Sequence, residues 1–462
     1  MSRSRQPPAE ARCHWCLTSI TTRGLPVPKC TDGIVSFGKV GRRVVQAAFD
    51  GGDIVSDGGV MLVREVDRRL GLTKAAAGAF TDDRRAASVQ HSVHDMVAQR
   101  VYAMCCGWED VSDHNELRGD VVLQTAVGRA EELASGPTLS RLETAATPQL
   151  AGALNAVLVD AFIASHTEAP REVVLDIDAT HVPLHGAQER AHFHYHYDNY
   201  CYLPLYVFAG QDLLACVLRP SSRDPASVLS ALVKLLAAKL RQAWPNVRLI
   251  VRADSGFCRP RALRRFDKWG VHYVIGLAKN EALLHRVAFA QLALAEQQQR
   301  EGGKQRVIGE FAYGARSWDC ERRVIARLEH DDRGANPRFI VTSLQGDAQA
   351  LYEQLYCARG EAENRIKEAQ IDLFGRRASC HKFAANQLRL LLAALAYTLM
   401  INLRRLALKG TELERACTDT IRTKLLKIGA AVVRNTRRVR LLLASSHPLK
   451  HVFLTAAQAL AP

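Results

Sequence analysis

The stretch Val173-Val-Leu-Asp176-Ile-Asp178-Ala-Thr180 decides the fold that the sequence predicts. Apolar and acidic residues alternate along it, which is the period of a β-strand and sends Asp176 and Asp178 to the same side. A second run, Val247-Arg-Leu-Ile-Val-Arg-Ala-Asp254, also ends in an acid. Because a carboxylate after a buried strand is costly unless a cation or hydrogen bonds satisfy it, the two runs indicate an α/β sheet with a cation-binding edge.

A third acid lies in Tyr356-Cys-Ala-Arg359-Gly-Glu-Ala-Glu363-Asn-Arg-Ile-Lys367. Residues three and four apart are neighbours on a helix, so the spacing predicts one face that carries Tyr356, Arg359, Glu363 and Lys367. Alone, such a run is more often an exposed helix with ion pairs. With the two strand acids upstream, it predicts a cage of three carboxylates for a divalent metal.

The elements between these acids have a definite predicted order: strand, strand, strand, helix, strand, helix, strand. A hairpin turn at Gly210 joins two apolar runs, and Asp224 with Pro225 provides an N-cap and a first-turn proline for the following helix. After the first strand, we expect strands at 200–208 and 213–218, a helix at 226–244, the strand ending at Asp254, a helix from Pro260 and a strand at 271–277.

That order, with acids on the first and fourth strands and on a late helix, resembles the ribonuclease H-like catalytic core. More closely, the chain resembles DDE-type bacterial insertion-sequence transposases with a Tyr-x2-Arg-x3-Glu signature helix, and among them the insertion-sequence thirteen-eighty family. Besides the three acid-bearing segments, the resemblance rests on Ser56-Asp-Gly-Gly59, Gln99-Arg-Val-Tyr102 and Thr138-Leu-Ser-Arg-Leu-Glu143.

The resemblance implies that Asp178, Asp254 and Glu363 are the catalytic, metal-binding triad. The implied cofactor is Mg²⁺, for which Mn²⁺ can substitute, and Asp176 is expected to be a partner that orients the metal ligands. The triad would cleave DNA at insertion-sequence ends and transfer the freed strand into target DNA by two-metal phosphoryl transfer. The implied partners are the terminal inverted repeats, target DNA and a second copy of the chain.

Three further residues of the signature helix are expected to contact DNA: Tyr356, Arg359 and Lys367. The chain departs from the broader signature at Gln370, where a lysine is usual, and Lys367 on the same face takes that place. Two alternatives stay open, a ribonuclease H-like nuclease without strand transfer and an inactive, transposase-derived DNA-binding repressor.

The expected fold is α/β, with a β-rich insertion in the catalytic core and helical regions on both sides. The expected ranges are an N-terminal extension at 1–32, a helical DNA-end-binding region at 33–168, the core at 169–280 and 345–375, the insertion at 281–344, and a basic helical region at 376–462. Within the N-terminal region an extended segment is expected at 43–49, with helices at 59–70, 91–105 and 148–164.

The distribution of charge supports a DNA partner. The chain of 462 residues carries a net charge of +15. Residues 376–462 hold sixteen Lys and Arg against three acids, or +13, and residues 1–32 hold five against two, or +3, so the middle is close to −1. A basic tail supplies the salt-dependent attraction to phosphates, although a solubilising tail has the same composition.

Other features predict the environment of the protein. No signal peptide is evident, and the apolar run at 388–403 contains Arg389 and is too short to span a bilayer, so it is expected to be a buried helix. Twelve cysteines without framework spacing are typical of reduced thiols in the bacterial cytoplasm.

Three local features are weaker. Cys13, Cys16 and Cys30, with His14, are compatible with a zinc site, but a second pair at defined spacing is missing. The alternating histidines 192, 194 and 196 are expected in a hairpin rather than on a metal. Trp318 is expected to pack in the core, with stacking on an unpaired DNA base as the alternative.

Overall fold

The computed structural model describes residues 33–461 apart from 374 and 376. It divides into two compact units, Met1–Gly52 and Asp53–Pro462. The described part of the first unit is a hairpin of β1 (Val35–Val40) and β2 (Arg43–Ala47), whose residues are all exposed. The extended segment predicted from Arg43 is therefore confirmed. The expected N-terminal extension and the four residues of the weak zinc pattern lie outside the described residues.

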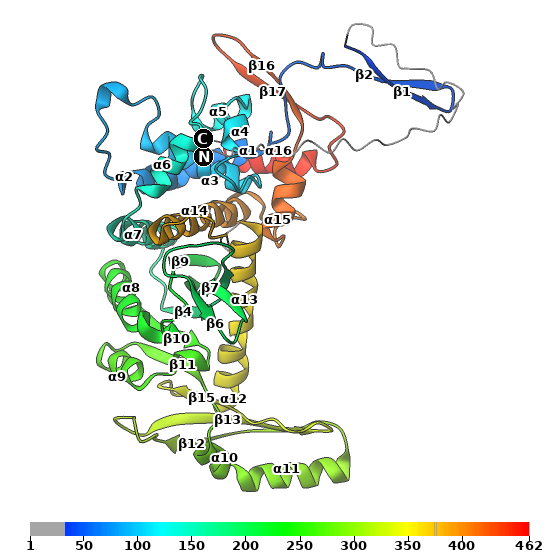
Figure 1. Cartoon of the computed structure of the whole chain (residues 1–462). Coiled ribbons are helices and arrows are strands. Elements are labelled where there is room, and N and C mark those ends of the chain that lie inside the picture. Colours follow the sequence, from blue (N-terminus) through cyan, green and yellow to red (C-terminus); the bar gives the residue numbers. More distant parts are fainter. Residues whose placement is uncertain (1–32, 374, 376, 462) are drawn as a thin grey trace, which may run out of the picture. The chain divides into compact units, whose positions relative to one another are not determined.

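The second unit is built around a nine-stranded mixed sheet in the order β12-β13-β15-β11-β10-β4-β8-β9, with β14 beside β13 (Figure 1). Five of its strands are β4 (Glu172–Ala179), β8 (Leu205–Ala209), β9 (Asp212–Val217) at one edge, β10 (Arg248–Ala253) and β11 (His272–Leu277). Strands β4, β10 and β11 are parallel, whereas β8 and β9 are antiparallel to their neighbours.

Helical connections make the parallel pairing possible. Helix α8 (Leu229–Ala243) leads from β9 to β10, and α9 (Pro260–Lys268) leads from β10 to β11. Parallel strands need such crossovers because their connecting chain must return along the sheet. Among the strands of the large sheet, the predicted order of strand, strand, strand, helix, strand, helix, strand is confirmed.

Two predicted boundaries were wrong. The run at 200–208 divides into β7 (Asn199–Tyr202), which belongs to a small sheet with β5 (Val182–Pro183) and β6 (His192–His194), and β8. Pro204 lies between the two strands, where its missing N–H interrupts pairing. The helix expected at 226–244 starts as a 3₁₀ turn, Pro225–Ser227, before α8. Its predicted cap is confirmed, because the Asp224 side chain accepts the Ala226 N–H at 2.8 Å.

The segment after β11 extends the central sheet. Helices α10 (Glu281–Arg286) and α11 (Ala288–Glu301) are followed by β12 (Gln305–Tyr313), β13 (Arg322–Asp331), β14 (Gly334–Ala335) and β15 (Arg338–Thr342). Because β15 pairs antiparallel with β11, these β-rich residues continue the same hydrogen-bonded ladder. Trp318 packs on this core, with its ring centroid 5.6 Å from that of Tyr313, so the predicted core packing is confirmed.

A layer of helices packs on the β9 end of the sheet. It contains α1 (Val60–Leu70), α2 (Leu72–Gly78), α3 (Val93–Cys105), α4 (His114–Leu117), α5 (Val121–Val127), α6 (Gly136–Thr144) and α7 (Pro148–Ala164). Helix α14 (Phe383–Ala407) contacts α1, α3 and α7 as well as β9, and thus joins the layer to the sheet. In the described chain, α14 is the one single helix with the length and apolarity of a membrane span. Since 83% of its apolar window is buried, the prediction of a buried helix is confirmed.

The C-terminal region combines helices with a β hairpin that the sequence analysis did not predict. After α14 come α15 (Thr418–Ile421), β16 (Ala430–Arg434), β17 (Val439–Leu443) and α16 (Lys450–Ala459). Strand β16 also pairs with β3 (Ile54–Val55), which makes a three-stranded sheet. The region expected to be helical at 376–462 is therefore not helical throughout, because β-branched Val432, Val433 and Val439 favour paired strands here.

Candidate active site

Two of the predicted acids lie at one edge of the central sheet. Strands β4 and β10 are adjacent and parallel, with Ile177 opposite Ala253, so Asp178 and Asp254 follow at the same carboxyl edge. The Asp178 side chain is 16% exposed. The Asp254 carboxylate caps a 3₁₀ turn by accepting the Gly256 N–H at 2.8 Å.

The third acid is carried by an irregular helix. The predicted helix is present, but it changes from a π-helical segment, Leu351–Tyr356, through a 3₁₀ turn, Cys357–Arg359, to α13 (Gly360–Lys367) and a second π-helical segment, Glu368–Asp372. Such π segments often occur at functional sites. Helix α13 packs against β4, which brings Glu363 towards the acidic edge of the sheet.

Arg359 links the first and third acids. Its Nη1 lies 3.5 Å from Asp178 Oδ2, and its Nη2 lies 2.9 Å from Glu363 Oε1. Among the described residues, no three His, Cys, Asp or Glu side chains lie close enough together to hold a metal ion. With one nitrogen near each carboxylate, the Arg359 guanidinium places a positive charge between two of the predicted metal ligands.

The electrostatics of Asp178 indicate that more positive charge would be favourable. Burial raises the pKa of Asp178 to about 6; the Arg359 guanidinium opposes the increase, while Asp254 and Glu363 add to it. In this environment the charged form of the carboxyl group is destabilised relative to the protonated form. Three carboxylates are hard oxygen donors, the ligands that Mg²⁺ and Mn²⁺ take, so the donor set fits the predicted ion by its chemistry.

Asp176 forms a cross-strand ion pair with Arg252. It is 2% exposed and lies directly opposite Arg252, whose Nη2 donates to Asp176 Oδ2 at 2.8 Å. Arg252 Nη1 donates to the carbonyl of Leu355 at 2.5 Å. The pair therefore fastens the signature helix to β4 and β10, one residue before Tyr356. The sequence analysis did not predict a role for Arg252. The period of a β-strand could have indicated one, because Arg252 lies two residues before Asp254 and therefore on the same side of the strand.

Tyr356 packs against the sheet beside the acids. A Cβ atom on Gly276 of β11 would lie 2.7 Å from the Tyr356 hydroxyl and 2.8 Å from the Ser255 nitrogen, so only glycine leaves room there. Burial raises the pKa of Tyr356 above its ordinary value. Lys367 is exposed, and within the described chain it has no ion pair.

Gln370, the departure from the broader signature, lies beside β4. It is 7% exposed, and its Oε1 accepts the Thr180 hydroxyl at 3.2 Å. Both residues line a cavity of about 980 Å³ next to the acidic edge, together with Glu109, His181, Pro183, His185, Gly186, Gln188, Arg377, Ala378 and Ser379. The sequence analysis did not predict this cavity because its lining comes from four separate segments.

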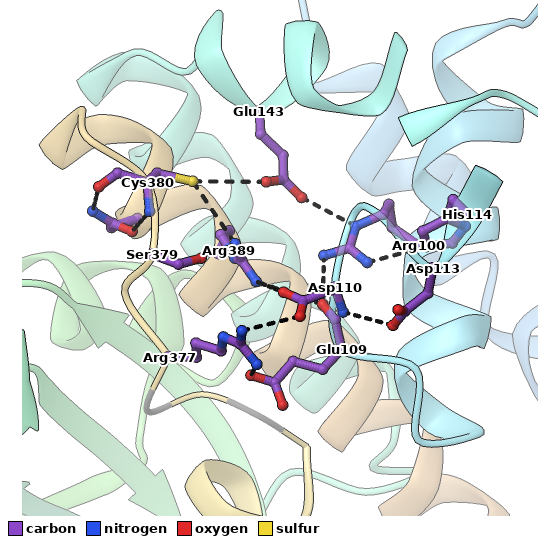
Figure 2. A network of polar contacts seen from close by, with 11 residues as sticks. Arg100, Glu109, Asp110, Asp113, His114, Glu143, Arg377, Ser379, Cys380 and Arg389 are labelled. Carbon is purple, nitrogen blue, oxygen red and sulfur yellow. Dashed lines mark hydrogen bonds and ion pairs between the residues drawn. The ribbon is translucent and has the colours of Figure 1, made fainter. Parts of the chain in front are cut away.

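A network of ion pairs and hydrogen bonds ties one wall of that cavity to the helical layer (Figure 2). Arg100 of α3 is fully buried, and its Nε lies 3.0 Å from the Glu143 carboxylate. The Cys380 thiol donates to Glu143 at 3.9 Å, and Arg377 pairs with Glu109 at 2.6 Å and Asp110 at 3.0 Å. The loop after the signature helix is therefore held by charges from the layer.

The alternating histidines lie in a hairpin, as predicted. His192 and His194 belong to β6, and the turn to β7 contains His196. The ring centroids of His194 and His196 are 6.4 Å apart, and both rings contact Tyr197. These contacts are aromatic packing.

Comparison with known proteins adds a family. Residues 37–462 match the family described as transposase DDE domain group 1. Among solved structures, the chain is similar to a piggyBac transposase in a synaptic complex with hairpin DNA, at 8% identity and a TM-score of 0.43, over 80% of each chain. No match was found among curated proteins.

Proposed function

Because the chain belongs to the family of DDE transposases, we propose that it cleaves DNA at the ends of an insertion sequence and joins the freed strand to target DNA. The observation that carries the proposal is the meeting of Asp178 and Asp254 at one sheet edge with the helix that bears Glu363. The family assignment by itself gives a phosphoryl-transfer enzyme. The signature helix favours the insertion-sequence thirteen-eighty branch, in which the core is ribonuclease H-like.

Asp178, Asp254 and Glu363 would hold Mg²⁺, or Mn²⁺ in its place. The bound ions would supply an activated water and charge stabilisation at the leaving oxygen. A bound cation would also offset the cost of burying the negative charge of Asp178, the effect that raises its pKa in the metal-free site. The Asp176–Arg252 pair would act at a distance, by holding the helix at Leu355 so that Glu363 reaches the edge of the sheet.

The basic residues of the signature helix would bind the phosphates of the DNA. Lys367 is exposed and available to a phosphate, and Arg359 would exchange its two carboxylate partners for phosphate oxygens when cations occupy the acids. Tyr356 would support the helix against β11 next to the bound strand. In the proposed reaction, water attacks one phosphorus and a 3′-hydroxyl leaves; that hydroxyl then attacks a target phosphate and displaces a second 3′-oxygen.

The proposed partners are the terminal inverted repeats, target DNA and a second copy of the chain, since two ends must be joined in one event. We propose that residues 33–168 bind the element ends, and that the core at 169–280 and 345–375 carries the chemistry around the insertion at 281–344. The basic region at 376–462 would add phosphate contacts.

A strand-transfer assay tests this proposal against its two rivals. Labelled DNA with the ends that flank the gene is incubated with a supercoiled target plasmid and Mg²⁺. A transposase yields label covalently joined to the plasmid, whereas a nuclease yields cut ends alone. Specific end binding with neither product would identify a DNA-binding repressor and overturn the proposal.

A further inference from the structure

The hairpin of β16 and β17 is a cationic arm. It carries four exposed arginines, Arg434, Arg437, Arg438 and Arg440. In the described part of the chain, none of the four has an ion pair with an acid. From residue 420 to the last residue, 462, the sequence contains no Asp or Glu. The charge of this arm is therefore not compensated by its neighbours in sequence or in space.

The base of the arm is fixed. Ala430 and Ala431 of β16 pair with Val55 and Ile54 of β3, and the ladder to β17 continues beyond this contact to the pair of Arg434 and Val439. Because the Val432 N–H also donates to the Asp53 carbonyl at 2.8 Å, the two residue pairs Val433–Arg440 and Arg434–Val439 extend past the support, over about 7 Å at the rise of a β-strand. Figure 1 shows the hairpin as an orange ribbon that protrudes beyond α15 and α16.

The tip is also defined. The Asn435 side-chain oxygen accepts the backbone N–H groups of Arg437 and Arg438 at 3.0 and 2.9 Å, and the Asn435 backbone N–H donates to the Arg438 carbonyl at 2.9 Å. Asparagine closes turns in this way without help from other elements. The two tip arginines are therefore presented on an ordered turn.

The arginines surround the arm instead of lining one side. Residues opposite each other in an antiparallel ladder share a face, so Arg434 lies with Val439, while Arg440 lies with Val433 on the other face. Two faces and the tip are all cationic. A ligand that fits this arrangement presents negative charge on two facing walls and leaves room for a ribbon about two strands wide.

Duplex DNA has this form. Its major groove is about 12 Å wide and about 8.5 Å deep, admits a two-stranded ribbon, and is bordered by phosphates on both sides. Resting on the transposase function proposed above, we propose that the β16–β17 arm enters the major groove of duplex DNA and neutralises phosphates on both walls. This contact lies outside the set of acids and adds a grip on DNA that does not depend on the metal.

The test is the salt dependence of binding to a labelled mixed-sequence duplex, measured by fluorescence anisotropy in EDTA. The variant Arg437→Gln/Arg438→Gln removes two tip charges. Each neutralised phosphate contributes about 0.9 to the slope of log K against log salt, so the slope should fall by about 1.8 and affinity near 0.1 M salt should drop roughly tenfold per arginine.

Two matched variants separate this contact from general charge. Arg437→Lys/Arg438→Lys keeps the charges and should keep the parent slope. Arg171→Gln/Lys234→Gln removes two exposed charges from elsewhere in the second unit and should change the slope by much less. Circular dichroism and melting temperature verify folding, and because the tip side chains are exposed we expect neither to change.

An unchanged slope in the tip Gln variant, or an equal fall in the control, would overturn the inference while leaving the proposed function intact. A change of oligomeric state without a change of slope would mean that the arm binds a second copy of the chain, which also overturns it. If the parent bound no duplex at any salt concentration, the transposase proposal itself would fail.

Discussion

Replacement of Asp178 by asparagine should stabilise the metal-free protein. Burial raises the pKa of this carboxyl from the ordinary 3.8 to about 6. Between these values the native state binds more protons than the unfolded state, so stability falls as pH rises through this window and the loss persists above it. Since one pKa unit corresponds to about 1.36 kcal/mol, the charged carboxylate costs about 3 kcal/mol at pH 8.

The measurement is denaturant unfolding in EDTA, followed by tryptophan fluorescence, for the parent and Asp178→Asn. We expect the variant to be more stable by about 3 kcal/mol at pH 8 and by about half of that at pH 5, where the parent carboxyl is mostly protonated only in the native state. The control Asp83→Asn removes an exposed acid and should change stability by less than about 0.5 kcal/mol.

A variant no more stable than the parent at pH 8 would refute the reasoning. So would a stabilisation that did not change between pH 5 and pH 8, because the effect would then come from packing and not from the charge. Added Mg²⁺ should reduce the difference, since bound cations would stabilise the parent carboxylate and not the amide.

Two more predictions concern the residues that position the signature helix. Arg252→Met leaves Asp176 buried without its cation and should lower the free energy of unfolding by about 3–5 kcal/mol. The double variant Asp176→Leu/Arg252→Met should recover most of this loss. A larger loss in the double variant than in the single variant would contradict the pairing. Gly276→Ala places a Cβ 2.7 Å from the Tyr356 hydroxyl and should lower the free energy of unfolding, measured by thermal unfolding, by about 1–3 kcal/mol. The control Gly309→Ala, whose Cβ would have nothing within 4 Å, should not destabilise the protein. Equal effects of the two substitutions would mean that crowding at Tyr356 is unimportant.

Local sequence patterns predicted the central elements well because each is specified by its own residues. The alternation around Asp176 and Asp178 produced β4, and the capping pair Asp224 and Pro225 marked the start of the following helical segment. The boundary at Pro204 could also have been predicted, since proline interrupts pairing.

The parts that the sequence could not predict depend on contacts between distant segments. The position of Arg359 between Asp178 and Glu363 arises from packing of α13 on β4, and helical spacing gives only its proximity to Glu363. The cross-strand pair of Asp176 and Arg252 requires the register of β4 and β10. The cavity beside Gln370 is likewise a product of tertiary packing.

The central claim is that Asp178, Asp254 and Glu363 together form the metal-dependent catalytic site. Its most direct test is cleavage of labelled DNA carrying the element ends, with Mg²⁺ or Mn²⁺, by the parent and by Asp178→Asn, Asp254→Asn and Glu363→Gln. We predict metal-dependent nicking at the element boundary by the parent, loss of nicking in each variant, and retained DNA binding in all. Parent-level cleavage by any of the three variants would contradict the assignment.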